Sequence, residues 1–353
     1  MALTAAGAAG APFLVGGFAP ASNGLTAQEV VERIRKNVGV DWSDDGVDTF
    51  KAGDPSTVVT GVVTTSMATL EVLRKAVQAG ANLVITAAPT FYSRADLREL
   101  PARGGGPGAG GARGAPRGGG AGTTPPASPA AISGPGTGAS APMPPAPPLP
   151  EAVVPPSQRG AFAAGAASPP ADPVYSGKNT FIDQHKLVIY RLTEHWNRRN
   201  PDPRALGLAA AMGWTKYKAG EDARSYEIPA IAFDTLAGQL KKALGARGGI
   251  RAVGDRTLTV RRVGLLPGFT LIKDAIAMLP AADVIITGEV QEWESATYVQ
   301  DVAFAGLKKG FVSIGRVVNE APGMQVCADW LKTIVAEVPI RCIPAGDPYW
   351  RPL

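Results

Sequence analysis

Histidine and cysteine are scarce in this chain of 353 residues. The two cysteines, Cys327 and Cys342, are too few for a disulfide framework or a four-thiolate zinc site, so we interpret them as buried free thiols. The two histidines are His185 and His195. Any metal site would therefore have to use carboxylates or be poor in ligands.

Long apolar runs and a strong charge are also missing. No run of about 18 strongly apolar residues occurs, which predicts that no helix spans a membrane. The formal charge is +5, but four arginines and one glutamate lie between residues 101 and 171, so only +2 remains elsewhere. This near-neutral remainder argues against a broad nucleic-acid surface. The 45% hydrophobic content is enough to fill the core of a folded protein.

Two segments differ in composition from the rest. Residues 1–24 are small and apolar and lack a basic start, so they fit either the end of an export signal or a flexible leader, and both an exported and a cytoplasmic location stay open. Residues 102–173 consist mainly of Gly, Pro and Ala, which predicts a disordered insertion. Its Arg-Gly-Gly character suggests RNA binding, but no aromatic residue lies between 101 and 161, which favours a spacer.

The first regular pattern is a helix followed by a βαβ unit. Thr26 and Glu29 have the spacing of a capping box and predict a helix over about 26–37. The segment "STVVTGVVTT" predicts a strand, "MATLEVLRKAVQAG" a helix and "ANLVIT" a second strand. That second strand ends at Ala87 and Ala88.

A similar unit follows about two hundred residues later, in "RRVGLLPGFTLIKDAIAMLPAADVIITGEVQ". We match Gly61 with Gly264 and Thr86 with Thr287. The repeat predicts an α/β protein with two pseudo-symmetric lobes, whose mixed sheets face a shared cleft. We assign residues 25–101 and 174–246 to the first lobe and 247–353 to the second. Function is then expected where strands end.

Several blocks resemble one family. "VDTFKAGDPSTVVTGVVTT", "AGANLVITAAPTFYSRAD", "VIYRLTEHWNRR", "VIITGEVQEWESATYVQDV" and "FVSIGRVVNEAPGM" are similar to the NGG-one-interacting-factor-three-like proteins. These proteins are also labelled dinuclear metal centre hexameric proteins, or type-2 GTP cyclohydrolase I. The resemblance implies a toroidal homo-oligomer, typically a hexamer, with two divalent ions of the zinc, iron or manganese class held between the lobes by His, Asp and Glu.

This chain departs from the family at the ligand positions that the resemblance implies. The ligand pair after the second strand falls on Ala87 and Ala88, and the loop aspartate falls on Asn197 or, as a second possibility, Glu194. In "GRVVNE" the family histidine becomes Arg316, whereas the glutamate stays as Glu320. A guanidinium remains protonated and repels cations. We therefore expect no metal, or one weakly bound ion.

Each candidate residue has two interpretations. Glu320 is either a ligand or, as the spacing favours, the partner of Arg316 in an ion pair. His195 is either a substitute ligand beside Glu194 or, as is more usual for a lone histidine, a packed residue. Glu289 and Arg316 are further candidates for the cleft.

Three functions remain open at this point. The first is a non-catalytic or altered paralogue that binds a small anionic ligand beside Arg316. The second is a metal-dependent hydrolase, similar to type-2 GTP cyclohydrolase, with Glu194, His195 and Glu320 as substitute ligands. The third is an oligomeric scaffold. The sequence does not decide whether the protein is an enzyme.

Overall fold

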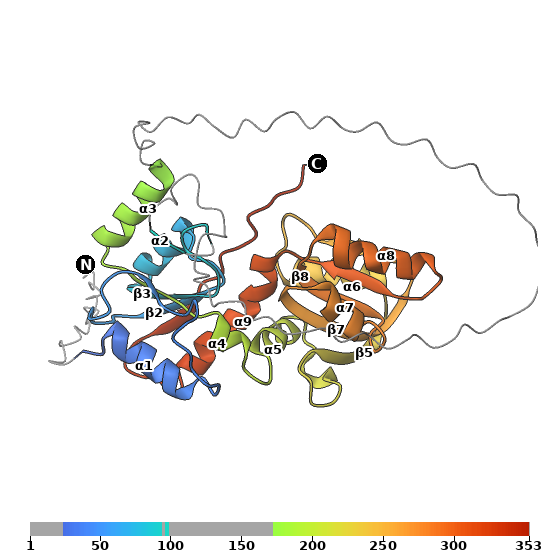
Figure 1. Cartoon of the computed structure of the whole chain (residues 1–353), viewed down its shortest axis with the longest axis horizontal. Coiled ribbons are helices and arrows are strands. Elements are labelled where there is room, and N and C mark those ends of the chain that lie inside the picture. Colours follow the sequence, from blue (N-terminus) through green and yellow to red (C-terminus); the bar gives the residue numbers. More distant parts are fainter. Residues whose placement is uncertain (1–23, 94–95, 99–171, 353) are drawn as a thin grey trace, which may run out of the picture. The chain divides into compact units, whose positions relative to one another are not determined.

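Two five-stranded mixed sheets form the framework of the part of the chain that the structure describes (Figure 1). The structure is a computed structural model that describes residues 24–93, 96–98 and 172–352. The predicted leader over 1–24 and the predicted insertion over 102–173 lie almost wholly outside these residues. In the described ranges, no helix is long and apolar enough to cross a membrane.

The first sheet, sheet 1, has the strand order β1-β4-β3-β2-β10. Its strands are β1 (Phe50–Ala52), β2 (Val62–Thr65), β3 (Leu83–Thr86), β4 (Val188–Arg191) and β10 (Ile340–Cys342). Strands β10, β2, β3 and β4 are parallel, and β1 is antiparallel to β4. Its helices are α1 (Ala27–Asn37), α2 (Leu70–Gln78), α3 (Pro173–Gln184), α4 (Glu194–Asn197) and α9 (Arg316–Leu331).

Helices cover both faces of sheet 1. On one face, apolar residues of α1 and α9 form a core cluster with alternate residues of β2, β3 and β4. On the other face, residues of α2 and α3 form a second cluster with the intervening residues of the same three strands. Because both faces are buried, β2 and β3 carry apolar or small residues at every position, which is the pattern of a covered parallel sheet. Helix α1 begins with the predicted capping box, in which Thr26 and Glu29 bond each other's backbone N–H groups.

The second sheet, sheet 2, has the order β5-β7-β8-β9-β6. Its strands are β5 (Ser225–Ala232), β6 (Arg251–Val253), β7 (Thr259–Phe269), β8 (Val284–Glu289) and β9 (Gly310–Ser313). Helices α5 (Pro203–Ala211) and α6 (Phe233–Ala243) pack into one of its core clusters, and α7 (Ile272–Met278) and α8 (Thr297–Phe304) into the other. The 3-10 turn η1 (Thr215–Tyr217) follows α5, and the π-helical turn η2 (Glu292–Ala296) leads into α8.

The two sheets repeat one topology, which confirms the predicted pair of α/β lobes. In each lobe, the chain forms an antiparallel strand and then three strands that are parallel to one another. Their order in space is β1-β4-β3-β2 in sheet 1 and β6-β9-β8-β7 in sheet 2. Of the matched threonines, Thr86 ends β3 opposite Thr65, whereas Thr287, opposite Leu266, lies two residues before the end of β8 at Glu289, so this part of the match needs correction. The glycine match was wrong, because Gly264 lies opposite Ile285 and so occupies the place of Val63, two residues after Gly61.

The predicted lobe boundaries need correction. Within the range 174–246 assigned to the first lobe, β5 pairs with β7 of sheet 2 and α6 packs on that sheet. Within the range 247–353 assigned to the second lobe, β10 pairs with β2 of sheet 1. Helix α9 contacts strands of both sheets.

Candidate functional site

The candidate site lies at the carboxyl edge of sheet 1, where ligands of open α/β sheets usually bind. The register of the parallel strands places Thr65, Thr86 and Arg191 in one row at this edge. Ser66 and Ala87 follow the first two strands, and the Ala88 N–H donates to the Ser66 carbonyl over 2.9 Å. The sequence thus delivers Ala87 and Ala88 to the expected edge.

The two alanines are packed into this edge. Each is about 5% exposed, and Ala87 belongs to the core cluster under α1 and α9. The Ala87 carbonyl accepts a hydrogen bond from Thr193 Oγ1 (2.5 Å), which ties the ends of β3 and β4 together. Since a methyl group offers no lone pair, what these residues contribute to the edge is a backbone acceptor and apolar volume.

Asp48 is a buried carboxyl group that organises the turn after β4. Its Oδ1 accepts from the N–H groups of Thr193 (2.6 Å) and Glu194 (3.1 Å), and its Oδ2 accepts from the N–H of His195 (2.9 Å). A carboxylate in this place satisfies the free donors at the start of the short helix α4. Asp48 thereby fixes the position of residues 193–195.

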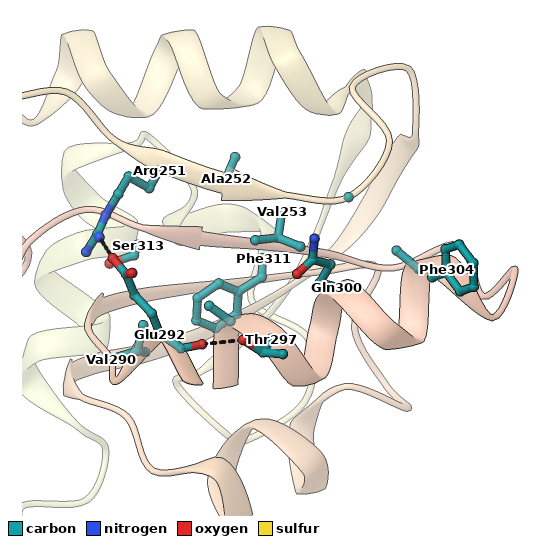
Figure 2. A pocket seen from close by; sticks show the side chains of 13 residues that line it. Arg251, Ala252, Val253, Val290, Glu292, Thr297, Gln300, Phe304, Phe311 and Ser313 are labelled. Atoms are coloured by element: carbon teal, nitrogen blue, oxygen red, sulfur yellow. Dashed lines mark hydrogen bonds and ion pairs between the residues drawn. The ribbon is translucent and has the colours of Figure 1, made fainter. Parts of the chain in front are cut away.

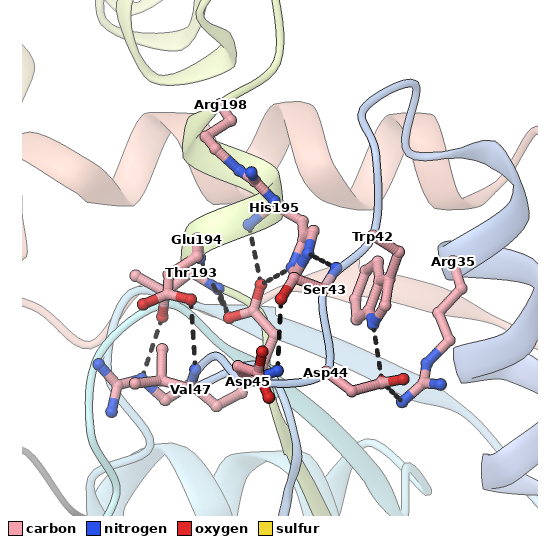
Figure 3. A network of polar contacts seen from close by, with 12 residues as sticks. Arg35, Trp42, Ser43, Asp44, Asp45, Val47, Thr193, Glu194, His195 and Arg198 are labelled. Carbon is pink, nitrogen blue, oxygen red and sulfur yellow. Dashed lines mark hydrogen bonds and ion pairs between the residues drawn. The ribbon is translucent and has the colours of Figure 1, made fainter. Parts of the chain in front are cut away.

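His195 is held on every side and is not available as a metal ligand. Its Nε2 accepts the Ser43 N–H (3.0 Å), and its Nδ1 lies 2.7 Å from Asp48 Oδ2. Nε2 therefore carries no proton, and Nδ1 bears the hydrogen that it donates to Asp48. The imidazole also stacks on Trp42 at 3.6 Å between ring centroids (Figure 3). The packed, hydrogen-bonded interpretation is confirmed, and the substitute-ligand interpretation is not supported.

Asp96 is a second buried carboxylate, in the loop after β3. Its Oδ1 accepts from the N–H groups of Thr90 (2.6 Å) and Phe91 (2.7 Å). Its Oδ2 lies 3.9 Å from Arg191 Nη1. Arg191 in turn donates through Nε to Thr193 Oγ1 (3.0 Å). The edge therefore contains a carboxylate and a guanidinium in a buried, charge-balanced pair.

Lys178 of α3 is a third charged group buried at the Asp96 loop. Its Nζ donates to the Thr90 carbonyl (2.5 Å) and lies over the rings of Tyr92 (4.9 Å) and Phe91 (5.7 Å). Burial lowers the pKa of Lys178 to about 8, and the negative charge of Asp96 opposes that shift. Burial likewise lowers the pKa of Arg191, the negative charges of Asp96 and Asp48 oppose that shift, and the positive charge of Arg316 adds to it.

Arg316 and Glu320 form the ion pair that their spacing predicted. Arg316 Nε lies 3.4 Å from Glu320 Oε1, and Glu320 is almost fully buried. The neighbouring Asn319 side chain accepts the Gly268 N–H through Oδ1 (2.9 Å). Gly268 has φ +83°, and a Cβ there would lie 2.8 Å from Glu320 Oε1. Glu320 is thus enclosed at the carboxyl edge of sheet 2.

The remaining predicted residues do not join one cluster. Glu194 is exposed, and its Oε2 accepts the Val47 N–H at 3.4 Å. Asn197 ends α4 and is half-buried. Glu289 ends β8, is exposed, and accepts the Thr270 N–H through its backbone carbonyl.

Three residues of this edge were missed by the sequence reasoning, namely Asp48, Asp96 and Lys178. The first two stand in "VDTF" and "SRAD", inside blocks that carry the resemblance, but an aspartate in a loop is usually solvated. Lys178 had a usable signal, because Tyr175, Lys178 and Ile182 have helical spacing and place a lysine in an apolar stripe.

The donor set does not fit the dinuclear centre that the fold family implies. In the described ranges of the chain, no three His, Cys, Asp or Glu side chains are grouped so that they could hold a metal ion. The lone pairs of His195 are engaged, Asp48 and Asp96 accept backbone N–H groups, and Glu320 pairs with a guanidinium. A divalent ion needs several such donors at once.

Comparison with known proteins gives a match in structure and none in sequence. No protein-family model and no curated protein matches the chain. The fold is similar to a hypothetical protein of Staphylococcus aureus, SA1388, with a TM-score of 0.58 and 13% identity over 94% of this chain and 100% of that one. A Bacillus cereus protein related to NIF3 gives 0.56 and 13% over 94% and 100%.

A third solved structure, reduced HcgD from Methanocaldococcus jannaschii, gives a TM-score of 0.51 and 13% identity over 90% of this chain and 97% of that one. At such identities the likeness establishes the fold and leaves the site chemistry to the residues themselves. NIF3 is the abbreviation of NGG-one-interacting factor three, the name carried by the family that the sequence blocks resemble. The chain therefore has the fold of the NIF3-related proteins.

Proposed function

We propose that the protein binds a small anionic ligand where Arg191 and Arg316 approach each other, in place of the two divalent ions of the family it resembles. The observation that carries the proposal is the position of Arg316, which begins helix α9 at an end that no side chain of the described residues caps. Burial lowers the pKa of Arg191, Asp96 and Asp48 oppose that shift, and the positive charge of Arg316 adds to it.

The start of helix α9 supports the same ligand charge. The helix has 16 residues and begins at Arg316, with Gly315 as its N-cap. Among the described residues, no side chain caps this end, and its first turn contains no acidic residue. Free N–H groups and the helix dipole at such an end favour anions, and phosphates and carboxylates commonly bind there.

The test is isothermal titration calorimetry with inorganic phosphate, pyrophosphate and citrate. We expect Arg316→Gln to weaken binding about 10- to 100-fold, because a hydrogen bond to a charged group contributes about 1.5–3 kcal/mol. Arg261→Gln is the matched control, since Arg261 is an exposed arginine of β7. Equal binding by both variants, or no binding of any of the three anions, would refute the proposal.

The metal-dependent hydrolase is the alternative that elemental analysis tests. Near-stoichiometric zinc, iron or manganese in protein purified without chelators, and its loss in Glu320→Ala, would replace the anion proposal. In the opposite direction, Ala87→His, Ala88→Glu and Arg316→His together should restore metal binding. If this triple variant folds and gains no metal, our mapping of the family positions is wrong.

We also propose that the protein is a homo-oligomer, as the resemblance implies. Exposed apolar side chains of the second lobe support this proposal, because Trp293 and Phe304 are 73% and 93% exposed. Phe304 borders a cavity of about 620 Å³ between β6 and α8 (Figure 2). Such patches often mark contact surfaces. Light scattering should show a smaller assembly for Phe304→Asp and no change for Val174→Asp, an exposed site on α3.

A further inference from the structure

The cavity between β6 and α8 has the size and the walls of a small-molecule site (Figure 2). Its volume is about 620 Å³, and ligand pockets usually measure about 300–1,000 Å³. The ring of Phe311 faces it, and Val253 of β6 and Ala296 of η2 are further apolar parts of its wall. Neither Arg191 nor Arg316 is among the described residues that line it, so the cavity is separate from the proposed anion site.

Polar groups gather at one end of this cavity. Arg251, Glu292 and Ser313 lie together at that end, whereas Phe304 lies at the other (Figure 2). Arg251 Nη1 donates a hydrogen bond to Glu292 Oε1. Ser313 is 6% exposed and donates through Oγ to the Gly288 carbonyl (3.1 Å), and a hydroxyl oxygen that donates still has lone pairs that can accept. This end therefore offers donors and acceptors together, and the charges of the ion pair cancel.

The ion pair at this end favours an uncharged ligand. A ligand carboxylate there would be attracted by Arg251 and repelled by Glu292, and a ligand ammonium group would be attracted by Glu292 and repelled by Arg251. A primary amide suits both side chains, because its oxygen accepts from a guanidinium and its NH₂ group donates to a carboxylate. The two side chains are 64% and 73% exposed, so their own ion pair contributes little and a ligand separates them at small cost.

The π-helical turn η2 forms part of the cavity wall. Its first residue, Glu292, and its last, Ala296, both line the cavity. Thr297, which follows the turn, donates through Oγ1 to the Glu292 carbonyl (2.8 Å). Single π-helical turns are rare and frequently occur at functional sites. This turn supplies one polar group and one apolar surface to the same cavity.

We propose that this cavity binds a small neutral ligand with an aromatic body and a primary amide head. The amide lies between Arg251 and Glu292, where it accepts from the first and donates to the second. The aromatic body lies against the ring of Phe311, because offset-stacked and edge-to-face contacts between rings are favourable. Phe304, at the other end, is 93% exposed and remains available for the contact between copies proposed above.

The experiment compares three ligands that share one aromatic body, by calorimetric titration of the full-length protein with 3-phenylpropanamide, 3-phenylpropanoate and 3-phenylpropylamine. We expect the amide to bind at least about tenfold more tightly than either charged compound. Glu292→Gln should strengthen binding of the carboxylate and Arg251→Gln that of the amine, each by about tenfold, because each variant removes the repelling charge. Arg256→Gln is the matched control, since Arg256 is an exposed arginine in a surface ion pair with Asp234, and it should change none of the three affinities.

A second pair of variants tests the cavity itself. Ala303 lines the cavity, so Ala303→Phe should fill it and weaken binding of the amide at least about tenfold. Ala305→Phe, at the exposed C-cap of the same helix, should leave that affinity unchanged. Tighter binding of a charged compound to the wild type, or the same order of affinities in both charge variants, would overturn the proposal.

The remaining outcomes separate this proposal from the other two. Arg251→Gln should leave phosphate binding unchanged, and Arg316→Gln should leave amide binding unchanged, so that either site can fail without the other. If none of the three compounds binds and Phe304→Asp reduces the size of the assembly, a second copy fills the cavity and the ligand proposal is overturned.

Discussion

Replacing Lys178 by methionine should change how stability depends on pH. In the folded protein the pKa of Lys178 is lowered from 10.5 to about 8 by burial, so the folded state releases this proton near pH 8. The unfolded state keeps the proton up to about pH 10.5, and it therefore binds more protons throughout this window. Stability must then rise with pH, because deprotonation removes the cost of a buried charge.

The size of the effect follows from the shift. A difference of about 2.5 pKa units corresponds to about 3.4 kcal/mol, of which about 2.5 kcal/mol falls between pH 7 and pH 10. Urea unfolding of the wild type and of Lys178→Met at both pH values measures it. The stability of the wild type relative to the variant should increase by about 2.5 kcal/mol over this range.

Taking the difference between the two proteins removes the other groups that titrate in this range, such as Tyr92, whose pKa burial raises. Lys241→Met is a matched control on the exposed face of α6, and we expect no such pH-dependent difference for it. A difference below about 0.5 kcal/mol for Lys178→Met would show that the ammonium is solvated in the folded state, and the burial argument would fail.

Four other substitutions test hydrogen bonding, packing and helix capping in the framework of the site. Asp48→Asn should cost about 3 kcal/mol in urea unfolding, because an amide nitrogen would face the N–H groups that the carboxylate now accepts; an unchanged midpoint would contradict this. Gly207→Ala should cost at least about 1–3 kcal/mol, because its Cβ would lie 2.4 Å from the Pro322 carbonyl oxygen of α9. Gly177→Ala, with no described atom within 4 Å of its Cβ, should instead add about 0.5–1 kcal/mol. Thr26→Ala should cost about 1 kcal/mol through loss of the capping box, and thermal unfolding would reveal it.

Local sequence patterns were enough to predict helices and strands, and to predict one contact between residues of the site. The capping residues Thr26 and Glu29 mark the start of α1, and the apolar strands are buried on both faces as their composition indicates. The Arg316–Glu320 pair follows from a spacing of four residues on a helix, which depends on no distant part of the chain.

The contacts of His195 could not be predicted from its neighbours in the sequence. Its ring is engaged by Ser43, Trp42 and Asp48, which lie about 150 positions earlier in the chain. No sequence pattern near His195 indicates contacts with a loop that is so distant in the sequence. The lobe boundaries failed in the same way, because β10 adds to sheet 1 from the far end of the sequence.

The sequence by itself determined the α/β class and the repeated βαβ unit, because these depend on residue identity and short-range periodicity. Only the tertiary structure decided which charges meet. It buried Lys178 beside the Asp96 loop and brought Arg316 within electrostatic reach of Arg191. The energies of these groups depend on distance and on exclusion of water, and neither property is encoded in the residues that flank them.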